Sequence, residues 1–421
     1  MKPDRPERVK LGMQPRSPID RSSAAILTVE PVEEVIVPAA LPCLDVIPVI
    51  DEPVLPTRFG PRRIWRGITS FGEWCFGVVA LVVGLAVLAA LPVVQFLTLG
   101  YLLESGGRVA RTGRLREGFI GVRIAARMGS IVLGSWLMLL PLRIVSSLWA
   151  SAQLIDPDGP VASGWKTFLT ILTVFMVVHI VAACSRGGKL RYFLWPFNGI
   201  WLIRRLWRGG YYTQARDAVW EFVKALRLPY YFWLGLRGFA GAFLWLAIPI
   251  TLLALGRKVP LVGFLGGFLL AIVLLYVPFL QIRFAAENRF RAFFEPRAIR
   301  AHFRRAPWAF AFALSITLLF AVPLYALKIE MIPREAAWLP SIVFLVFIFP
   351  ARLLTGWAYG RADRRPSPRH WFFRWTGRLG ILPVAAVYVI IVFFTQYAAW
   401  GGIWSLYEQH AFLLPVPFLG L

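Results

Sequence analysis

The chain has 421 residues, of which 58% are hydrophobic and 16% are charged, whereas soluble globular proteins carry about 25% charged residues. Its formal net charge of +24 would by itself indicate a nucleic-acid partner. The basic residues, however, stand between apolar blocks that are long enough to span a bilayer. We therefore expect anionic lipid headgroups as their partners and no nucleic acid, and the composition excludes an ordinary soluble domain.

Residues 1–57 are predicted to form a disordered, Pro-rich acidic tail, because prolines recur too often for a long helix. Its acidic residues between Glu30 and Glu52 have no Lys or Arg among them. Residues 58–70 then form a basic juxtamembrane segment. Because this hydrophilic stretch precedes the first apolar block, we expect no cleavable signal peptide and insertion from an internal span.

Eight apolar blocks follow, each with at least the roughly 20 residues that a helix needs to cross about 30 Å of hydrocarbon. They are 71–103, 128–150, 164–184, 230–255, 259–282, 308–329, 336–355 and 379–399. Trp149, Trp165 and Trp308 stand at or near block ends, as in an aromatic belt. The predicted fold class is an all-α membrane protein, a polytopic helical bundle of about eight transmembrane segments with basic amphipathic interfacial helices. The transmembrane domain covers 71–404, and 405–421 is a short C-terminal tail.

Four connections between the blocks are strongly basic, and the three between them are short and carry little net charge. The basic connections are 108–127, 186–227, 283–305 and 361–378. This alternation follows the positive-inside rule, which places the four basic segments in the cytoplasm. The turn Pro-x-x-Gln also recurs at 92–95 and 278–281, which indicates a weak internal repeat.

The first block leaves two topologies open. If 71–103 is one span that enters the cytoplasm at Glu104, the basic segment 58–70 lies outside, against the positive-inside rule. If Pro92 instead breaks the block into a hairpin, both ends lie in the cytoplasm, but a turn within lipid needs protein to cover its backbone groups. We expect a cytoplasmic tail.

The basic connections carry the clearest functional signal. In 115–127, apolar residues at helical spacing leave the arginines on another face, and in 191–208 tryptophans alternate with arginines. Thr213 is expected to cap a further amphipathic helix. We interpret these segments as helices in the headgroup plane, although the charges alternatively serve only to set orientation. The candidate lipid-binding residues are Arg116, Arg123, Arg127, Arg204, Arg205, Arg297 and Arg300.

We take five polar residues inside or at the edge of the apolar blocks as candidate intramembrane sites: Gln95, Gln281, Arg143, His179 and Arg237. Arg143 and Arg237 are within about seven residues of a block end, so we expect their charges to snorkel towards the headgroups. We expect His179 to bond to a neighbouring helix rather than to relay protons. The glycines of the fourth and fifth blocks are expected to permit close helix packing.

Signatures of enzymes and pumps are missing from the chain. We find no phosphate-binding loop, no H-E-x-x-H, no G-x-S-x-G and no Asp pair within a span. The three cysteines form no C-x-x-C pair, which indicates neither a disulfide framework nor a zinc site. We therefore expect no catalytic residue, no metal and no cofactor, and a protein that is not an enzyme.

The turn at 92–95, followed by Gly-Tyr-Leu-Leu-Glu at 100–104 and a basic run, resembles a family of bacterial multi-pass proteins that carry a domain of unknown function. That family is distantly similar to the membrane domains attached to some glycerophosphodiester phosphodiesterases. The resemblance covers 71–399 and implies location in the cell inner membrane. It implies no activity, because no phosphodiesterase catalytic domain is present here.

Three functional classes follow from these observations. The first is a non-enzymatic protein that engages anionic lipid or partner proteins through its Arg-rich cytoplasmic segments, which we favour. The second is a repeat-built secondary transporter, which requires an unwound span with convergent polar groups. The third is an enzyme that acts on lipids.

Overall fold

The computed structural model describes residues 61–157, 159–195, 197–207, 209, 211–326, 338–399 and 402–408. The chain divides into two units, Met1–Phe59 and Gly60–Leu421. The first unit, with the predicted tail and Cys43, lies outside the described residues. The described part of the second unit forms helices and turns without any strand, which confirms the all-α prediction.

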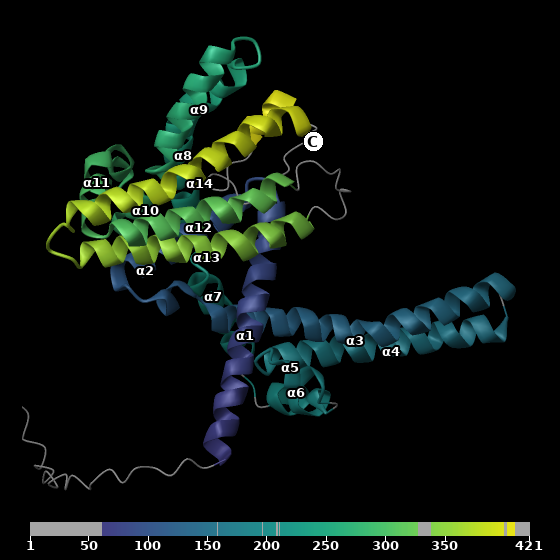
Figure 1. Ribbon diagram of the computed structural model, residues 1–421. Coiled ribbons are helices and arrows are strands. Elements are labelled where there is room, and N and C mark those ends of the chain that lie inside the picture. Colours follow the sequence, from purple (N-terminus) through teal and green to yellow (C-terminus); the bar gives the residue numbers. More distant parts are fainter. Residues whose placement is uncertain are drawn as a thin grey trace, which may run out of the picture. The chain divides into compact units, whose positions relative to one another are not determined.

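The helices alternate between long apolar segments and short pieces that connect them (Figure 1). In chain order they are α1 (Pro61–Ala90), α2 (Gln95–Thr112), η1 (Leu115–Gly118), α3 (Val122–Ile155), α4 (Pro160–Ser185), α5 (Leu190–Phe193), α6 (Asn198–Trp207), α7 (Tyr211–Ala225), α8 (Leu228–Leu255), α9 (Pro260–Leu274), α10 (Val277–Glu287), η2 (Phe290–Phe294), α11 (Pro296–Arg305), α12 (Pro307–Ala326), α13 (Trp338–Asp363), α14 (Trp371–Ala398), η4 (Gly402–Trp404) and α15 (Ser405–Glu408).

Eight helical segments of the described chain are long and apolar enough to cross a bilayer. They are Gly67–Ala90, Val122–Ile155, Pro160–Ser185, Ala215–Leu255, Pro260–Glu287, Pro307–Tyr325, Pro340–Asp363 and Trp371–Ala398. Each overlaps one predicted block, which confirms the prediction of about eight apolar helical segments, and the topology of the first block stays a prediction.

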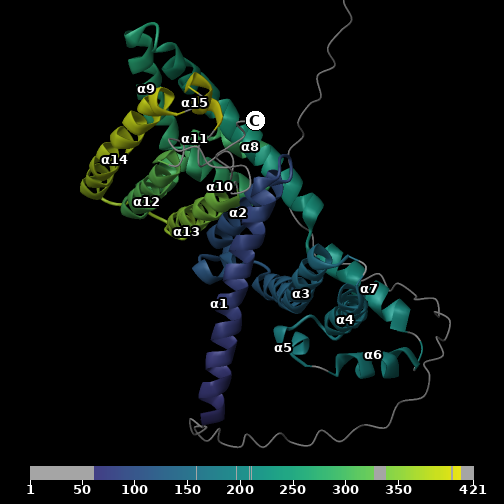
Figure 2. The same ribbon diagram turned by 90° about the vertical axis from the view of Figure 1, so that its right-hand side faces the viewer.

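The first predicted block is two helices rather than one. Helix α1 ends at Ala90, and α2 begins at Gln95 after a turn in which Val93 has a φ of 67°, a left-handed value that ends regular helix. The Thr98 hydroxyl donates to the Leu85 carbonyl at 3.0 Å and so ties the two helices together across the turn. Figure 1 and Figure 2 both show α1 running across the direction of α12 and α13. The chain therefore changes direction next to Pro92, where the sequence predicted a possible break.

Helix α2 is the centre of the bundle, since 13 of its 18 residues are buried. It packs against α8, α10 and α13, and glycine allows each close approach. A Cβ built on Gly235 of α8 would lie 1.9 Å from the Phe96 carbonyl oxygen, and one on Gly356 of α13 would lie 2.2 Å from the Gly106 oxygen. The predicted close packing at the α8 glycines is thus seen at the α2–α8 contact.

Helices α12, α13 and α14 lie side by side in Figure 1, and α12 packs against both of the others. The α3–α4 hairpin packs on α1, α5 and α6 and keeps most of its side chains exposed. For helices that cross a bilayer, such exposed apolar faces are the ones that lipid chains cover.

Candidate functional site

The loop between α13 and α14 is short because two prolines prevent helix from continuing through it. Pro366 and Pro368 lack backbone N–H groups, and each also restricts the residue before it. Helix α14 then starts behind His370, whose ring nitrogen accepts a hydrogen bond from the Phe372 N–H at 3.3 Å. The predicted basic connection 361–378 therefore consists mainly of two helix ends.

This loop folds back onto α11. The Arg369 N–H donates to the Arg304 carbonyl at 2.8 Å, and Arg365 Nη1 donates to the Arg305 carbonyl at 3.5 Å. These contacts bring together residues that are at least 60 positions apart in the sequence. They lie where α11, α12, α13 and α14 meet. Arg361, Arg365 and Arg369 are thereby placed around one hollow.

The hollow is a cavity of about 420 Å³, which we call the arginine cavity. It is lined by Ala306, Pro307, Trp308, Ala309, Phe312, Trp357, Arg361, Arg365, Arg369 and Phe373. Its apolar wall includes two strongly exposed rings, with Trp308 54% and Phe312 52% exposed. Both rings belong to α12, a membrane-crossing helix, so the cavity joins a charged end to an apolar side.

Positive charge in the arginine cavity is not balanced by its own lining, because none of the ten lining residues is acidic. Arg361 lies 5.3 Å from the centre of the Trp357 ring and Arg369 lies 5.6 Å from that of Phe373. Burial, followed by the like charges of Arg369 and Arg361, lowers the pKa of Arg365. Guanidinium stays protonated at any physiological pH, and a bound anion would relieve the smaller of these two effects, the repulsion from Arg369 and Arg361.

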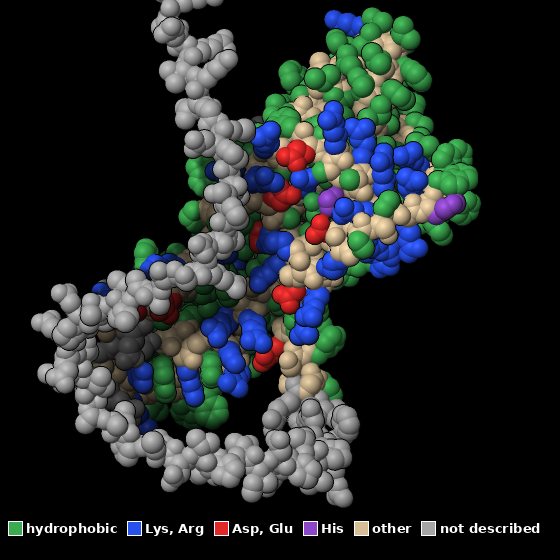
Figure 3. All heavy atoms as spheres, turned by 90° about the vertical axis from the view of Figure 1, so that its left-hand side faces the viewer, with side chains coloured by type: hydrophobic (Ala, Val, Ile, Leu, Met, Phe, Trp, Pro, Cys, Tyr) green, Lys and Arg blue, Asp and Glu red, His purple; other side chains and the backbone are tan. Residues whose placement is uncertain are grey.

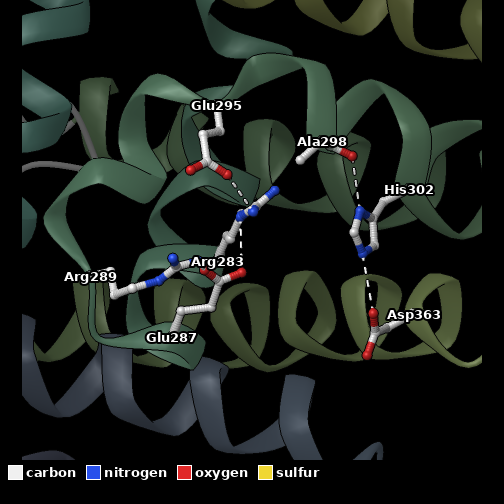
Figure 4. Close-up of polar contacts among 7 residues, drawn as sticks. All are labelled: Arg283, Glu287, Arg289, Glu295, Ala298, His302 and Asp363. Carbon is white, nitrogen blue, oxygen red and sulfur yellow. Dashed lines mark hydrogen bonds and ion pairs between the residues drawn. The ribbon is translucent and has the colours of Figure 1, made fainter. Parts of the chain in front are cut away.

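Several acidic side chains on the neighbouring elements already have cationic partners (Figure 4). Arg283 of α10 pairs with Glu287 at 3.0 Å and with Glu295 at 2.5 Å. Glu287 also pairs with Arg289, and this hydrogen bond raises the pKa of Arg289. These pairs connect the end of α10 to the start of α11.

His302 fastens α11 to the end of α13 beside the arginine cavity (Figure 4). Its Nδ1 lies 2.9 Å from the Ala298 carbonyl and its Nε2 lies 3.3 Å from an Asp363 carboxylate oxygen. The ring also stacks on Tyr359, with centroids 4.5 Å apart. Asp363 is therefore turned towards His302, two residues from Arg361.

Most of the predicted lipid-binding arginines are exposed, and they lie on four elements, α11, η1, α6 and α3. Arg297 and Arg300 lie on α11, and Arg116 lies in η1; both elements contact α13, whose end bears the arginine cavity. Arg204 and Arg205 lie on α6, which packs on α4 instead. Figure 3 shows Lys and Arg side chains gathered in a broad band on one face, with fewer Asp and Glu side chains among them.

The prediction of one amphipathic helix over 115–127 is wrong. The segment begins as the 3-10 turn η1 and is then broken at Gly121, whose φ of 69° favours glycine. Arg123 and Arg127 belong instead to the first turns of α3, where both are exposed.

Helices α6 and α7 form where the sequence predicts further helices, and their placement in the headgroup plane stays a prediction. On α6, Ile203, Leu206 and Trp207 are exposed on a helix that also carries the two arginines. Such a helix can lie in the headgroup plane with its apolar face in the hydrocarbon. The predicted capping role of Thr213 is wrong, because α7 starts two residues earlier, at Tyr211.

The intramembrane polar residues do not meet at one site. Arg143 is exposed on α3, and Arg237 is exposed beside Trp233 and Asn288 at a second cavity of about 360 Å³. His179 is buried and hydrogen-bonds through Nε2 to the Phe193 carbonyl at 2.8 Å, as expected of a structural histidine.

The two repeat glutamines have different environments. Gln281 is fully buried and its Oε1 accepts from Arg352 Nη1 at 2.6 Å. Gln95 is also buried, but its Oε1 has no hydrogen-bond partner within the described part of the chain. Arg352 was not among the sequence candidates, although an arginine three residues from a block end was a visible signal.

A partly buried polar contact forms where α2 meets α8 and α10. Glu104 pairs with Arg111 at 2.6 Å and accepts from the Tyr230 hydroxyl at 2.8 Å. Arg111 also donates to the Ala285 carbonyl at 3.0 Å. The contact joins α2 to α8 and α10, and its Tyr230 also lines the cavity beside Arg237.

The helices and the arginine cavity together define an integral multi-pass membrane protein of the all-α class. Comparison of the chain with protein-family models, with curated proteins and with solved structures finds no match. The resemblance noted at 92–104 therefore stays a prediction.

Proposed function

We propose that this is a non-enzymatic protein of the bacterial inner membrane that binds anionic lipid at its cytoplasmic face, with the arginine cavity as the principal site. The observation that carries the proposal is the convergence of Arg361, Arg365 and Arg369 on one cavity without an acidic lining residue. A cavity that is charged at one end and apolar along a membrane helix matches a lipid headgroup and the start of its chains.

The surrounding surface supports this proposal. Exposed arginines on α11 add positive charge on a helix that packs against α12 and α13, and α6 presents arginines together with exposed apolar side chains. Arginine suits this role because its planar fork binds phosphate oxygens in pairs. Under the positive-inside rule, this face is cytoplasmic.

The test compares two sets of three charge-neutralising substitutions in purified protein. The cavity variant carries Arg361→Gln, Arg365→Gln and Arg369→Gln. The control carries Lys166→Gln, Arg257→Gln and Lys258→Gln, which remove three charges outside the arginine cavity. Each surface arginine contributes on the order of 1 kcal/mol at an anionic membrane, so the cavity variant should bind anionic lipid roughly 100-fold more weakly.

The readout is the amount of anionic and zwitterionic lipid retained by each protein from an equimolar mixture, measured by native mass spectrometry. The control should retain anionic lipid like the parent. Equal retention by the cavity variant and the parent would refute the proposal.

A repeat-built secondary transporter is the alternative. The break between α1 and α2 and the short break between α9 and α10 favour it, because transporters use interrupted helices. Against it, Gln281 pairs with Arg352 in a packed core, and neither the arginine cavity nor the cavity beside Arg237 is lined by a repeat glutamine. Uptake of a solute into proteoliposomes that depends on Gln95 and Gln281 would favour the transporter.

A further inference from the structure

We infer that the arginine cavity takes a lipid with two phosphate groups in preference to a lipid with one. The inference rests on the proposed function and adds the chemical class of the ligand. Three guanidinium groups share the cavity, and its lining supplies no carboxylate. A single phosphodiester brings one negative charge and leaves two of these cations close together, whereas two phosphates bring at least two negative charges.

The hydrogen-bond donors of the cavity also exceed what one phosphate needs. Each guanidinium has five N–H donors in a fixed plane. Arg365 donates one of them to the Arg305 carbonyl at 3.5 Å. Arg361 and Arg369 contact aromatic rings through their charge, a contact that uses no N–H donor. Several N–H groups are thus left for phosphate oxygens, which arginine binds two at a time.

The repulsion within the cavity gives the preference a physical cause. Arg365 is the least exposed of the three arginines, and the charges of Arg361 and Arg369 act on it. A ligand that neutralises only one of the three leaves that repulsion largely in place. A ligand whose two phosphates pair with different arginines removes more of it, and each added pairing strengthens binding.

Size and surroundings indicate an amphiphile rather than a free anion. The volume of about 420 Å³ lies within the roughly 300–1,000 Å³ typical of ligand pockets, so it can hold more than one small anion. Trp308 and Phe312 stand exposed on the membrane helix α12 beside the charged end. Acyl chains that continue from a bound headgroup would cover both rings, and a free diphosphate would leave them bare.

The experiment measures the affinity of the full-length protein in detergent for four probes by native mass spectrometry. The probes are phosphatidylcholine, phosphatidylglycerol with one phosphodiester, cardiolipin with two, and inorganic pyrophosphate. We expect cardiolipin to bind at least about tenfold more tightly than phosphatidylglycerol, and pyrophosphate to bind more weakly than either anionic lipid.

Two single variants assign the preference to the cavity. Arg365→Gln should lower the ratio of cardiolipin to phosphatidylglycerol affinity, because one of the three arginines no longer pairs with phosphate. Arg365→Lys keeps the charge but not the planar fork, so it should keep part of the affinity ratio. A ratio that falls equally in both variants would indicate that the loss comes from misfolding. The control is Arg378→Gln, because Arg378 lies over the Phe303 ring and does not line the cavity.

Equal affinity for the two anionic lipids, both above phosphatidylcholine, would overturn this inference and leave the proposed function standing. Pyrophosphate binding as tightly as cardiolipin would overturn the assignment to a lipid. No preference for anionic over zwitterionic lipid would contradict the proposed function itself.

Discussion

Replacing Gly100 with alanine should destabilise the protein far more than one added methyl group would elsewhere, because Gly100 is where α2 meets α8. A Cβ built there would lie 1.8 Å from the Tyr231 carbonyl oxygen and 3.0 Å from the Gly235 nitrogen. Both neighbours are backbone atoms, so no side-chain rotation relieves the contact. To move the oxygen from 1.8 Å to 3.0 Å, the two helices must separate by about 1.2 Å.

Such overpacking of a close-packed core costs about 1–3 kcal/mol and at times more. Gly84→Ala on α1 is the control, because a Cβ there would have nothing within 4 Å. Alanine is the better helix former, so the control should be neutral or more stable by up to about 1 kcal/mol.

The assay is thermal unfolding of the detergent-solubilised protein, followed by intrinsic tryptophan fluorescence. Gly100→Ala should lower the midpoint and Gly84→Ala should not. Equal midpoints for Gly100→Ala and the parent would show that α2 and α8 do not cross as closely as described.

Three further predictions concern the basic face and the tail. Neutralising Arg116, Arg123 and Arg127 together should reduce co-purification of anionic lipid, by on the order of 1 kcal/mol of affinity per arginine, and unchanged retention would contradict it. Residues 25–56 carry acidic but no basic side chains, so we expect them to dock on the arginines of the basic connections. Deleting them should raise protease sensitivity in those connections at low salt, and an unchanged cleavage pattern would argue against docking. An impermeant thiol reagent should label Cys43 only after the cells are permeabilised, and labelling of intact cells would place the tail outside.

The spans could be predicted because the length and hydropathy of a segment are local properties of the chain. The break at 91–94 was partly visible through Pro92, whereas the left-handed φ of Val93 has no sequence signal of its own. The prediction of a helix over 115–127 was wrong because it relied on the apolar periodicity of the segment. Gly118 and Gly121, which interrupt that segment, indicate a break in the helix. Gly121 was the usable signal, since glycine commonly takes the left-handed conformation next to a helix end.

The arginine cavity could not be predicted in this way. Arg361, Arg365 and Arg369 stood in the sequence as ordinary members of a basic connection. Their convergence depends on contacts with α11 and α12, including the backbone hydrogen bond from Arg369 to Arg304. Burial of Arg352 is equally non-local, since it follows from the packing of α13 against α2 and α10.

The most direct test of anionic lipid binding is a structure of the protein determined by electron cryomicroscopy in nanodiscs that contain anionic and zwitterionic lipid in equal amounts. We expect headgroup density in the arginine cavity within hydrogen-bonding distance of Arg361, Arg365 and Arg369, with chains running along α12. The density should disappear in nanodiscs made of zwitterionic lipid alone. A cavity that stays empty in the mixed nanodiscs, or that fills equally in both, would contradict anionic lipid binding in the arginine cavity.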